Sequence, residues 1–248
     1  MRLIRCFIDA ELIAGSTINL NPRAAQHLLR VLRLQSGDKI NVFNGRGSEF
    51  SAHIASVRGD QACVAITVPY ESIRESSLAI TLVQGVSRGD RMDYVIQKAT
   101  ELGVCRIIPV LCERSVVRLD ERQAQARLTH WQGVAIAACE QSGRAHLPAI
   151  ELPVRLVEYF AHLNSSGSNS IQRVILDPEA TSGFSQLPST LAGIELLVGP
   201  EGGLSPTEAD LAKQQQFTAI RLGPRVLRTE TAAAAALAVL QALRGDLA

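Results

Sequence analysis

The chain has 248 residues, of which 46% are hydrophobic and 20% are charged, and its formal net charge at pH 7 is +1. A chain of this length and composition folds into one or two globular domains and is neither fibrous nor intrinsically disordered. No apolar run is long enough to cross a membrane and the first residues do not form a signal peptide, so we expect no membrane partner and a cytoplasmic location.

The first seventy residues predict a small β-barrel interrupted by one helix. The helix has Asn21 as its N-cap and Pro22 in its first turn, and leucines at 28, 29 and 32 share one face with Ala25. A polar segment over 70–77 is the expected linker, so we divide the chain into domains 1–72 and 73–248. Strands are expected at 3–8, 39–43, 49–57 and 62–68, with Gly-Asp and Asn-Gly turns beside them.

From residue 78 onward, apolar strands alternate with helices. This alternation predicts a mostly parallel sheet with helices on both faces. In such sheets ligands bind beyond the C-terminal ends of the strands, which directs attention to the loops that begin at Asp177, Gly199 and Gly223. The expected strands are 78–86, 104–111, 173–176, 194–198 and 219–222; the expected helices are 91–102 with Gly103 as its stop, 121–141, 155–163 and 231–243; residues 164–170 form a surface loop.

The first of two unusual loops is GPEGG at 199–203, which follows a buried apolar strand. Its glycines permit positive φ and let a ligand approach the backbone closely. Ser205 and Glu208 then form a capping box, with Pro206 at the first helical position. By itself this loop is equally well explained as a tight strand-to-helix connection that binds nothing.

The second loop, LGPRVLRTET at 222–231, places two arginines, a glutamate and two threonines before an alanine-rich helix. Thr229 or Thr231 is expected to cap that helix, and the helix is apolar enough to pack against protein on most of its surface. Capping does not account for Arg225 and Arg228 so near the strand ends. Neither loop matches the P-loop or the Rossmann fingerprint, which argues against those two nucleotide-binding classes.

The five cysteines do not form a recognisable framework. Their number is odd, no pair is spaced C-x-x-C, and no histidine cluster accompanies them. We therefore expect reduced, mostly buried thiols, with neither disulfides nor a bound metal.

Several further motifs accompany the two loops in chain order. They are HxxxVLR from His27 to Arg33, RGDRM at 88–92, QKATELG at 97–103, ERS at 113–115 and ACEQSGR at 138–144. With GPEGG and LGPRVLRTET, these blocks resemble the bacterial 16S rRNA (uracil(1498)-N(3))-methyltransferase family of the SPOUT class over nearly the whole chain.

The resemblance implies an α/β fold: a SPOUT domain with a trefoil knot and a mainly parallel sheet at 73–248, preceded by a PUA-like RNA-binding β-barrel at 1–72. It implies S-adenosyl-L-methionine, held by the three C-terminal loops, as cofactor. The substrate would be 16S rRNA, within an assembled small subunit. It also implies an obligate homodimer whose active site uses both subunits, with the alanine-rich last helix a candidate for the contact.

Methylation of uracil N3 requires loss of the imide proton and stabilisation of the anion that forms. Arg228 is the first candidate for the stabilising cation and Arg225 the second. Glu230 or Glu201 could accept the proton, or could instead orient an arginine or cap a helix. Cofactor contacts are expected from Leu176, Val198, Gly199, Pro200, Gly202, Leu222, Gly223, Leu227 and Thr229. RNA contacts are expected from Arg5, Arg23, Arg30, Arg33, Arg88, Arg91, Arg114 and Arg144.

Two other functions remain open at this point. One is a SPOUT methyltransferase that modifies a different position, such as a ribose 2′-hydroxyl of tRNA or rRNA. The other is a non-catalytic RNA-binding ribosome assembly factor, against which the intact loop residues argue. Binding of S-adenosylmethionine separates the second function from the enzymes.

Overall fold

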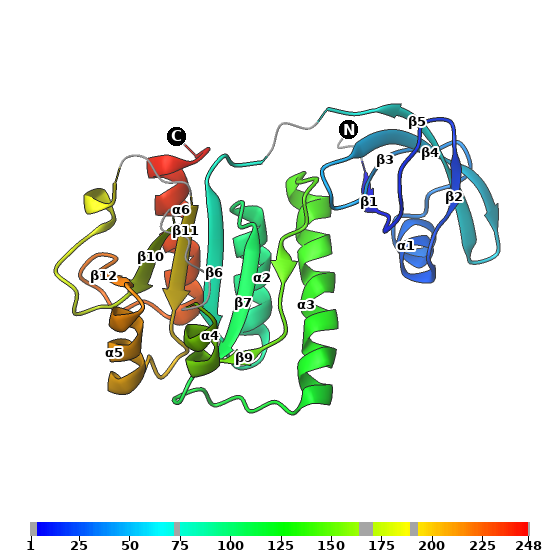
Figure 1. Ribbon diagram of the computed structural model, residues 1–248. Coiled ribbons are helices and arrows are strands. Elements are labelled where there is room, and N and C mark those ends of the chain that lie inside the picture. Colours follow the sequence, from blue (N-terminus) through cyan, green and yellow to red (C-terminus); the bar gives the residue numbers. More distant parts are fainter. Residues whose placement is uncertain (1–3, 72–74, 164–170, 189–192, 248) are drawn as a thin grey trace. The chain divides into compact units, whose positions relative to one another are not determined.

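The computed structural model describes residues 4–71, 75–163, 171–188 and 193–247 (Figure 1). Their contacts form two compact units, which are described separately. The first combines residues up to Glu75 with Ile136–Leu147, and the second combines Ser76–Ala135 with the chain from Pro148 onward. Within the described ranges, every helix is too short or too polar to cross a bilayer.

The first unit is built on a mixed five-stranded sheet in the order β1-β3-β4-β5-β2, in which only β1 and β3 are parallel. Asn21 caps the predicted helix by accepting a hydrogen bond from the Ala24 N–H at 2.8 Å. Leu28, from the π-helical turn η1, is fully buried against Ile40 and Val64 of the sheet. The elements are β1 (Arg5–Phe7), β2 (Thr17–Asn19), α1 (Pro22–Gln26), η1 (His27–Val31), β3 (Lys39–Phe43), β4 (Glu49–Arg58) and β5 (Gln61–Pro69).

The second unit is built on a seven-stranded sheet in which every pairing is parallel. The order is β12-β10-β11-β6-β7-β8, and β9 also pairs with β7. The strands are β6 (Ala79–Gly85), β7 (Arg106–Leu111), β8 (Ala149–Ile150), β9 (Val154–Arg155), β10 (Ile171–Leu176), β11 (Gly193–Val198) and β12 (Thr218–Ile220). The predicted parallel sheet is confirmed.

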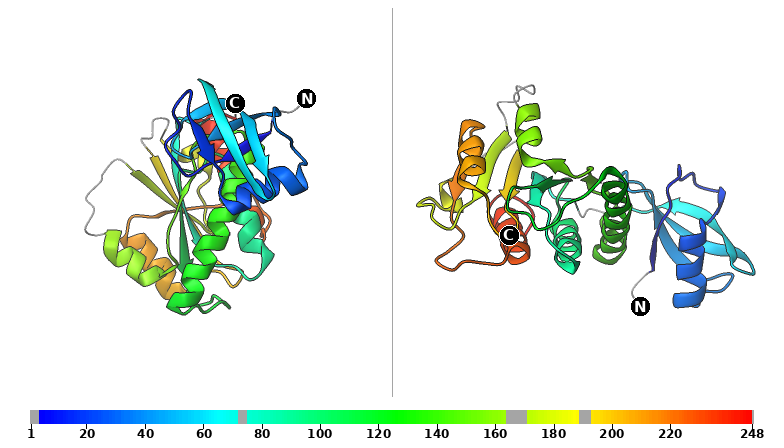
Figure 2. Two further views of the ribbon diagram at one scale, coloured as in Figure 1. Left: turned by 90° about the vertical axis from the view of Figure 1, so that its right-hand side faces the viewer. Right: turned by 90° about the horizontal axis from the view of Figure 1, so that it is seen from below.

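Helices cover both faces of this sheet, because successive residues of a strand point to opposite sides. Leu196 belongs to a core shared with α2, α3 and α6, whereas Leu197 belongs to a core shared with α4 and α5. The right-hand view of Figure 2 separates the layers, with the red α6 below the strands and the orange α5 above them. The helices are α2 (Asp90–Glu101), α3 (Glu121–Ser142), α4 (Leu156–Leu163), α5 (Pro206–Gln214) and α6 (Thr229–Arg244), with a 3-10 turn η2 (Phe184–Gln186).

Most predicted local signals are present. The capping box is complete, since Ser205 Oγ accepts from the Glu208 N–H and the Glu208 carboxylate accepts from the Ser205 N–H. Gly103 follows α2 with φ +80°, as a helix stop requires. The cap of α6 was predicted wrongly: Arg228 is the N-cap residue, its side chain makes no capping bond, and Thr229 is already the first helical residue.

The remaining differences concern short segments. β2, β8 and β9 were missed because two or three residues carry no periodicity. The strand predicted at 219–222 ends at Ile220, before the glycine turn. The loop predicted at 164–170 lies outside the described residues, and the trefoil knot stays a prediction.

Candidate active site

Three neighbouring parallel strands end at one edge of the sheet of the second unit: β10 at Leu176, β11 at Val198 and β12 at Ile220. The loops beyond these ends enclose a cavity of about 700 Å³. This is where the alternation of strands and helices predicted a ligand site. All the residues considered above as catalytic or cofactor-binding line it: Leu176, Val198, Gly199, Pro200, Glu201, Gly202, Leu222, Gly223, Arg225, Leu227, Arg228, Thr229 and Glu230.

The GPEGG loop is a tight turn that lies against the end of β6. The Gly203 N–H donates to the Pro200 carbonyl at 2.9 Å, and Gly203 has φ +68°. A side chain at Gly85 would bring its Cβ within 2.4 Å of the Pro200 nitrogen, so the two backbones touch. The other side of the loop is also tightly packed, because a Cβ on Gly202 would lie 3.0 Å from the Arg114 carbonyl oxygen. Glycine is required at Gly85 and favoured at Gly202.

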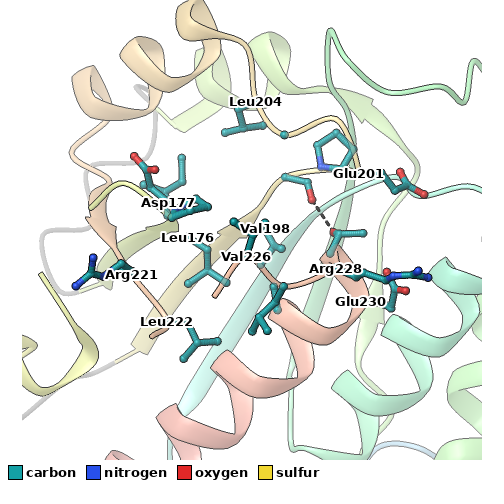
Figure 3. Close-up of a pocket in the computed structure, with 18 of the residues that line it drawn as sticks. Leu176, Asp177, Val198, Glu201, Leu204, Arg221, Leu222, Val226, Arg228 and Glu230 are labelled. Carbon is teal, nitrogen blue, oxygen red and sulfur yellow. Dashed lines mark hydrogen bonds between the residues drawn. The ribbon is translucent and has the colours of Figure 1, made fainter. Parts of the chain in front are cut away.

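The cavity has an apolar middle and charged ends. Figure 3 shows Leu176, Val198 and Leu222 between a group that contains Arg228, Glu230 and Glu201 and a second group, Asp177 and Arg221, on the opposite side. The loop after β12 forms an outer wall, in which the side chain of Val226 is 80% exposed. Gly223 has φ +74°, and no described atom lies within 4 Å of the position its Cβ would take. The arrangement suits a ligand with a flat apolar part and polar ends.

Glu201 has its carboxylate already engaged. Its Oε1 accepts hydrogen bonds from the backbone N–H of Arg88 at 3.0 Å and from Arg91 Nη1 at 2.9 Å. Partial burial opposes ionisation of this carboxyl, but the bonds from the Arg88 and Glu201 N–H groups and from the Arg91 guanidinium outweigh it and hold its pKa below the ordinary value. Glu201 is therefore a poor proton acceptor.

Glu230 has a freer carboxylate. Its side chain is only 16% exposed, and its Oε1 lies 4.0 Å from Arg91 Nε. Its Oε2 is buried and, among the described residues, has no hydrogen-bond partner. Arg91 thus stands between the two acidic side chains. Arg225 and Arg228 are exposed and make no ion pair within the described part of the chain.

Thr229 makes two hydrogen bonds within the protein through its hydroxyl. It is buried at 7% exposure, and its hydroxyl donates to the Gly199 carbonyl at 2.6 Å while accepting from Gln84 Nε2 at 3.0 Å. Its hydroxyl therefore joins the two loops at the wall of the cavity.

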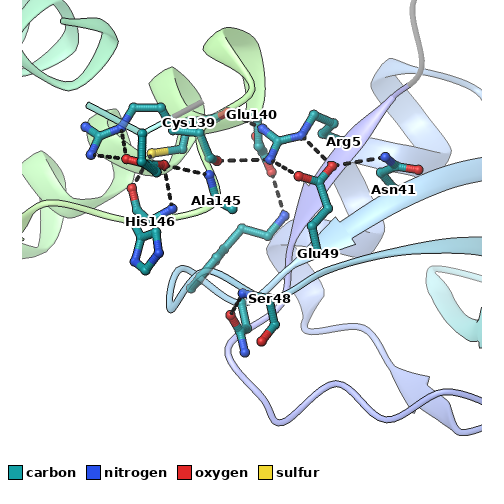
Figure 4. Close-up of polar contacts among 12 residues, drawn as sticks. Arg5, Asn41, Ser48, Glu49, Cys139, Glu140, Ala145 and His146 are labelled. Atoms are coloured by element: carbon teal, nitrogen blue, oxygen red, sulfur yellow. Dashed lines mark hydrogen bonds and ion pairs between the residues drawn. The ribbon is translucent and has the colours of Figure 1, made fainter. Parts of the chain in front are cut away.

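Two of the arginines expected at RNA, Arg5 and Arg144, have side chains that are only 9% and 4% exposed. Arg5 forms a two-point ion pair with Glu49 and also donates to the carbonyls of Cys139 and Arg144 (Figure 4). The guanidinium of Arg144 pairs with Glu75 at 2.8 Å, and its side chain is 4% exposed. Arg5 links β1 to the C-terminal end of α3, whereas Arg144 pairs with Glu75, so neither presents its charge to a phosphate.

The other six arginines of that set are exposed. In the first unit, Arg30 pairs with Asp60, and Arg33 follows η1 with φ +57°. In the second unit, Arg91 lies at the cavity and Arg114 Nη1 donates to the Gly202 carbonyl at 3.4 Å. Arg23 and Arg88 complete the exposed members.

Sequence reasoning missed two features of the site. Arg91 was considered only as an RNA contact, and its place between two carboxylates depends on the packing of α2 against α6. Gln84 was not considered, although a lone amide near the end of an apolar strand is a detectable signal. Cys6, Cys112 and Cys139 are buried, as expected of most thiols, and all five cysteines are free. No metal-ligand cluster occurs among the described residues.

Comparison with known proteins identifies a domain family for each of two parts of the chain. Residues 74–241 match the model of an RNA methyltransferase domain, and residues 20–67 match that of an RNA methyltransferase PUA domain. The ribosomal RNA small subunit methyltransferase E of Bacillus subtilis is 34% identical, with 98% of this chain and 99% of the relative aligned. That of Buchnera aphidicola from Schizaphis graminum is 32% identical over 99% of this chain and 98% of the relative.

Solved structures agree with these relatives. A methyltransferase from Legionella pneumophila, in complex with the cofactor SAM, is 39% identical with a TM-score of 0.94 over all of both chains. A ribosomal RNA small subunit methyltransferase E from Neisseria gonorrhoeae, bound to S-adenosyl methionine, is 35% identical with a TM-score of 0.91, again over both whole chains. A domain match over most of the chain, full-length relatives and a shared fold lead to one assignment: the chain belongs to the ribosomal RNA small subunit methyltransferase E family.

Proposed function

We propose that this protein transfers a methyl group from S-adenosylmethionine to 16S rRNA of the small ribosomal subunit. The observation that carries the proposal is the cavity at the ends of β10, β11 and β12, in a chain that matches the family along its whole length. The two relatives solved with S-adenosylmethionine share the fold of this chain over its full length.

The residues of the cavity fit this cofactor. Its volume of about 700 Å³ lies in the range of small-molecule sites. Leu176, Val198 and Leu222 offer apolar surface to an adenine ring, and the open space around Gly223 lets a ligand approach the backbone. Gly199 and Gly202 also line the cavity, where their backbone groups can form hydrogen bonds to a ligand. When bound, S-adenosylmethionine supplies an electrophilic methyl group.

We propose N3 of uracil 1498, the position modified by the family that the sequence resembles, as the acceptor. The N3 proton is weakly acidic, so a base must take it before N3 becomes nucleophilic. The negative charge that remains spreads over O2 and O4. Arg228, at the mouth of the cavity and without an ion pair in the described part of the chain, stabilises that charge, with Arg225 as the second candidate.

Glu230 is the better base of the two candidates. Its Oε2 is buried and has no hydrogen-bond partner in the described ranges, so it can accept a proton, whereas Glu201 holds two hydrogen bonds and has a lowered pKa. Arg91 orients both carboxylates. We therefore assign proton transfer to Glu230 and loop positioning to Glu201.

RNA binding is proposed for the exposed arginines only. Arg23, Arg30 and Arg33 form the set in the PUA-like domain, for which we keep the boundary at residue 72. Arg88 and Arg114 are the proposed RNA contacts of the second unit. Arg5 and Arg144 leave the set because they are buried in ion pairs with Glu49 and Glu75.

We also propose that the active form is a homodimer that acts on the assembled small subunit in the cytoplasm. Support comes from α6, whose alanine-rich sequence offers a closely packing surface. Light scattering on the purified protein, at concentrations bracketing those of the activity assay, tests the dimer. Comparison of free 16S rRNA with 30S subunits as substrates tests the second part.

Two measurements test the activity. Calorimetry with S-adenosylmethionine should show binding, and absence of binding would leave only a non-catalytic assembly role. Mass mapping of 16S rRNA from cells lacking the protein should show loss of one N3-methyluridine, restored by the unmodified gene and not by a catalytically inactive variant. Loss of a different methylated nucleotide would reassign the acceptor, and an unchanged map would refute rRNA methylation.

A further inference from the structure

Gln84 is a fully buried amide near the C-terminal end of β6. Its exposed fraction is 0%, and the strand around it is otherwise dominated by apolar side chains. Burying an amide in such surroundings is costly unless its polar atoms are bonded. Gln84 Nε2 donates to the Gly85 carbonyl at 3.1 Å and to Thr229 Oγ1 at 3.0 Å, whereas Oε1 has no partner among the described residues. The side chain is thus retained at a cost in stability.

The Thr229 hydroxyl that accepts from Gln84 also makes a hydrogen bond to the GPEGG loop. Because the Thr229 hydroxyl accepts from Gln84, its own proton is directed away from Gln84 and toward the Gly199 carbonyl, 2.6 Å from the hydroxyl oxygen. Three elements are joined in this way: β6, the loop after β11, and the first residue of α6. Gln84 lies opposite Val198 in the β6–β11 register, so the relay spans the strand end from which the loop starts.

A second contact at the same strand end acts on the same peptide. A Cβ on Gly85 would lie 2.4 Å from the Pro200 nitrogen and 2.8 Å from the Gly199 carbonyl carbon. These two atoms form the peptide bond whose oxygen accepts from Thr229. That peptide is therefore held both by backbone contact with Gly85 and by the relay.

We infer that Gln84 is a positioning residue for the cofactor loop. It acts through Thr229, which fixes the plane of the Gly199–Pro200 peptide and with it the wall of the cavity. The inference rests on the proposed function, since it assigns Gln84 to the binding of S-adenosylmethionine. Gln84 itself does not line the cavity, so it has no direct contact with the ligand to lose.

The test uses Gln84→Met, which keeps length and apolar bulk but removes the amide, together with Thr229→Val and the double variant. Calorimetry with the full chain should show S-adenosylmethionine binding weakened about tenfold in each single variant, the effect of one buried hydrogen-bond relay. The double variant should bind about as weakly as either single variant, because both break the same relay. Thr229→Ser keeps the hydroxyl and should restore near-normal affinity.

Gln241→Met is the matched control. Gln241 is also 0% exposed and bonded on both sides, to Ser76 Oγ and the Leu102 carbonyl, but it lies near the C-terminal end of α6, away from the cavity. This variant should lower thermal stability as Gln84→Met does, yet bind S-adenosylmethionine within about twofold of the unmodified chain.

The binding results distinguish a failure of the inference from a failure of the proposed function. If the unmodified chain binds S-adenosylmethionine while Gln84→Met binds it equally well, or while the two single effects add in the double variant, the inference is wrong. Equal weakening by Gln241→Met would also overturn it, since the effect would then follow stability alone. No binding by the unmodified chain would refute the proposed function and the inference together. Should Gln84→Met fail to fold, Gln84→Leu takes its place in the same comparison, because it also removes the amide at a position that does not line the cavity.

Discussion

Replacement of Glu230 by glutamine should separate the base from its neighbour Glu201. Glutamine keeps the shape of the side chain but cannot accept a proton at neutral pH. General base catalysis contributes roughly 10²- to 10⁴-fold to a rate. The single-turnover rate of methyl transfer at saturating cofactor and rRNA should therefore fall by about that factor in Glu230→Gln. In the described part of the chain, Oε1 lies 4.0 Å from Arg91 Nε and Oε2 has no hydrogen-bond partner, so this carboxylate is available to accept a proton.

Glu201→Gln is the matched variant. It replaces a charged acceptor by a neutral one in two hydrogen bonds, of 3.0 and 2.9 Å. Hydrogen bonds to charged groups contribute about 1.5–3 kcal/mol each when buried, but Arg91 is 44% exposed and solvent reduces this to about 1 kcal/mol. Glu201→Gln should therefore weaken cofactor binding by no more than about tenfold. A larger fall in the single-turnover rate for Glu201→Gln than for Glu230→Gln would refute the assignment.

Three further predictions follow from other parts of the chain. Arg228→Ala should lower the single-turnover rate about 10²- to 10³-fold while cofactor affinity changes only a few-fold; unchanged turnover would remove Arg228 from the mechanism. Arg5→Ala should lower the free energy of unfolding in urea by about 3–5 kcal/mol, because Glu49 is 2% exposed and loses its ionic partner. Arg23→Ala should leave unfolding unchanged. It should instead reduce the slope of the logarithm of RNA affinity against the logarithm of salt concentration by about one unit. A wild-type unfolding curve for Arg5→Ala would contradict the first part. Burial raises the pKa of the Cys6, Cys112 and Cys139 thiols to about 12, so a thiol reagent at pH 8 should label only Cys63 and Cys105 rapidly, and fast labelling of a third thiol would refute the burial.

Local pattern was sufficient to predict most of the second unit and the position of its cavity. Strand–helix alternation requires parallel strands, parallel strands place their C-terminal ends at one edge, and GPEGG and LGPRVLRTET each follow such an end. Many of the residues that line the cavity could therefore be named from the sequence, although Arg91 could not. The capping box at Ser205 and the helix stop at Gly103 are equally local, because their partners lie within four residues.

Partnership between distant side chains was decided only by the tertiary structure. Eight arginines looked alike in the sequence, yet Arg5 and Arg144 are buried in ion pairs while Arg23 and Arg33 are exposed. The partners of the two buried arginines, Glu49 and Glu75, are 44 and 69 residues away along the chain. Periodicity reports which face of an element is buried, but it carries no information about which remote groups meet there.

The same reason explains why the cap of α6 was predicted wrongly and why the base could not be chosen from the sequence. Thr229 has the residue type of a helix cap, but its hydroxyl donates to Gly199, 30 residues earlier, and accepts from Gln84. Glu201 and Glu230 were equivalent candidates for the base until the packing of α2 placed Arg91 between them. The sequence determined which two loops surround the cavity, and the tertiary structure decided which of their polar atoms are already occupied and which remain free.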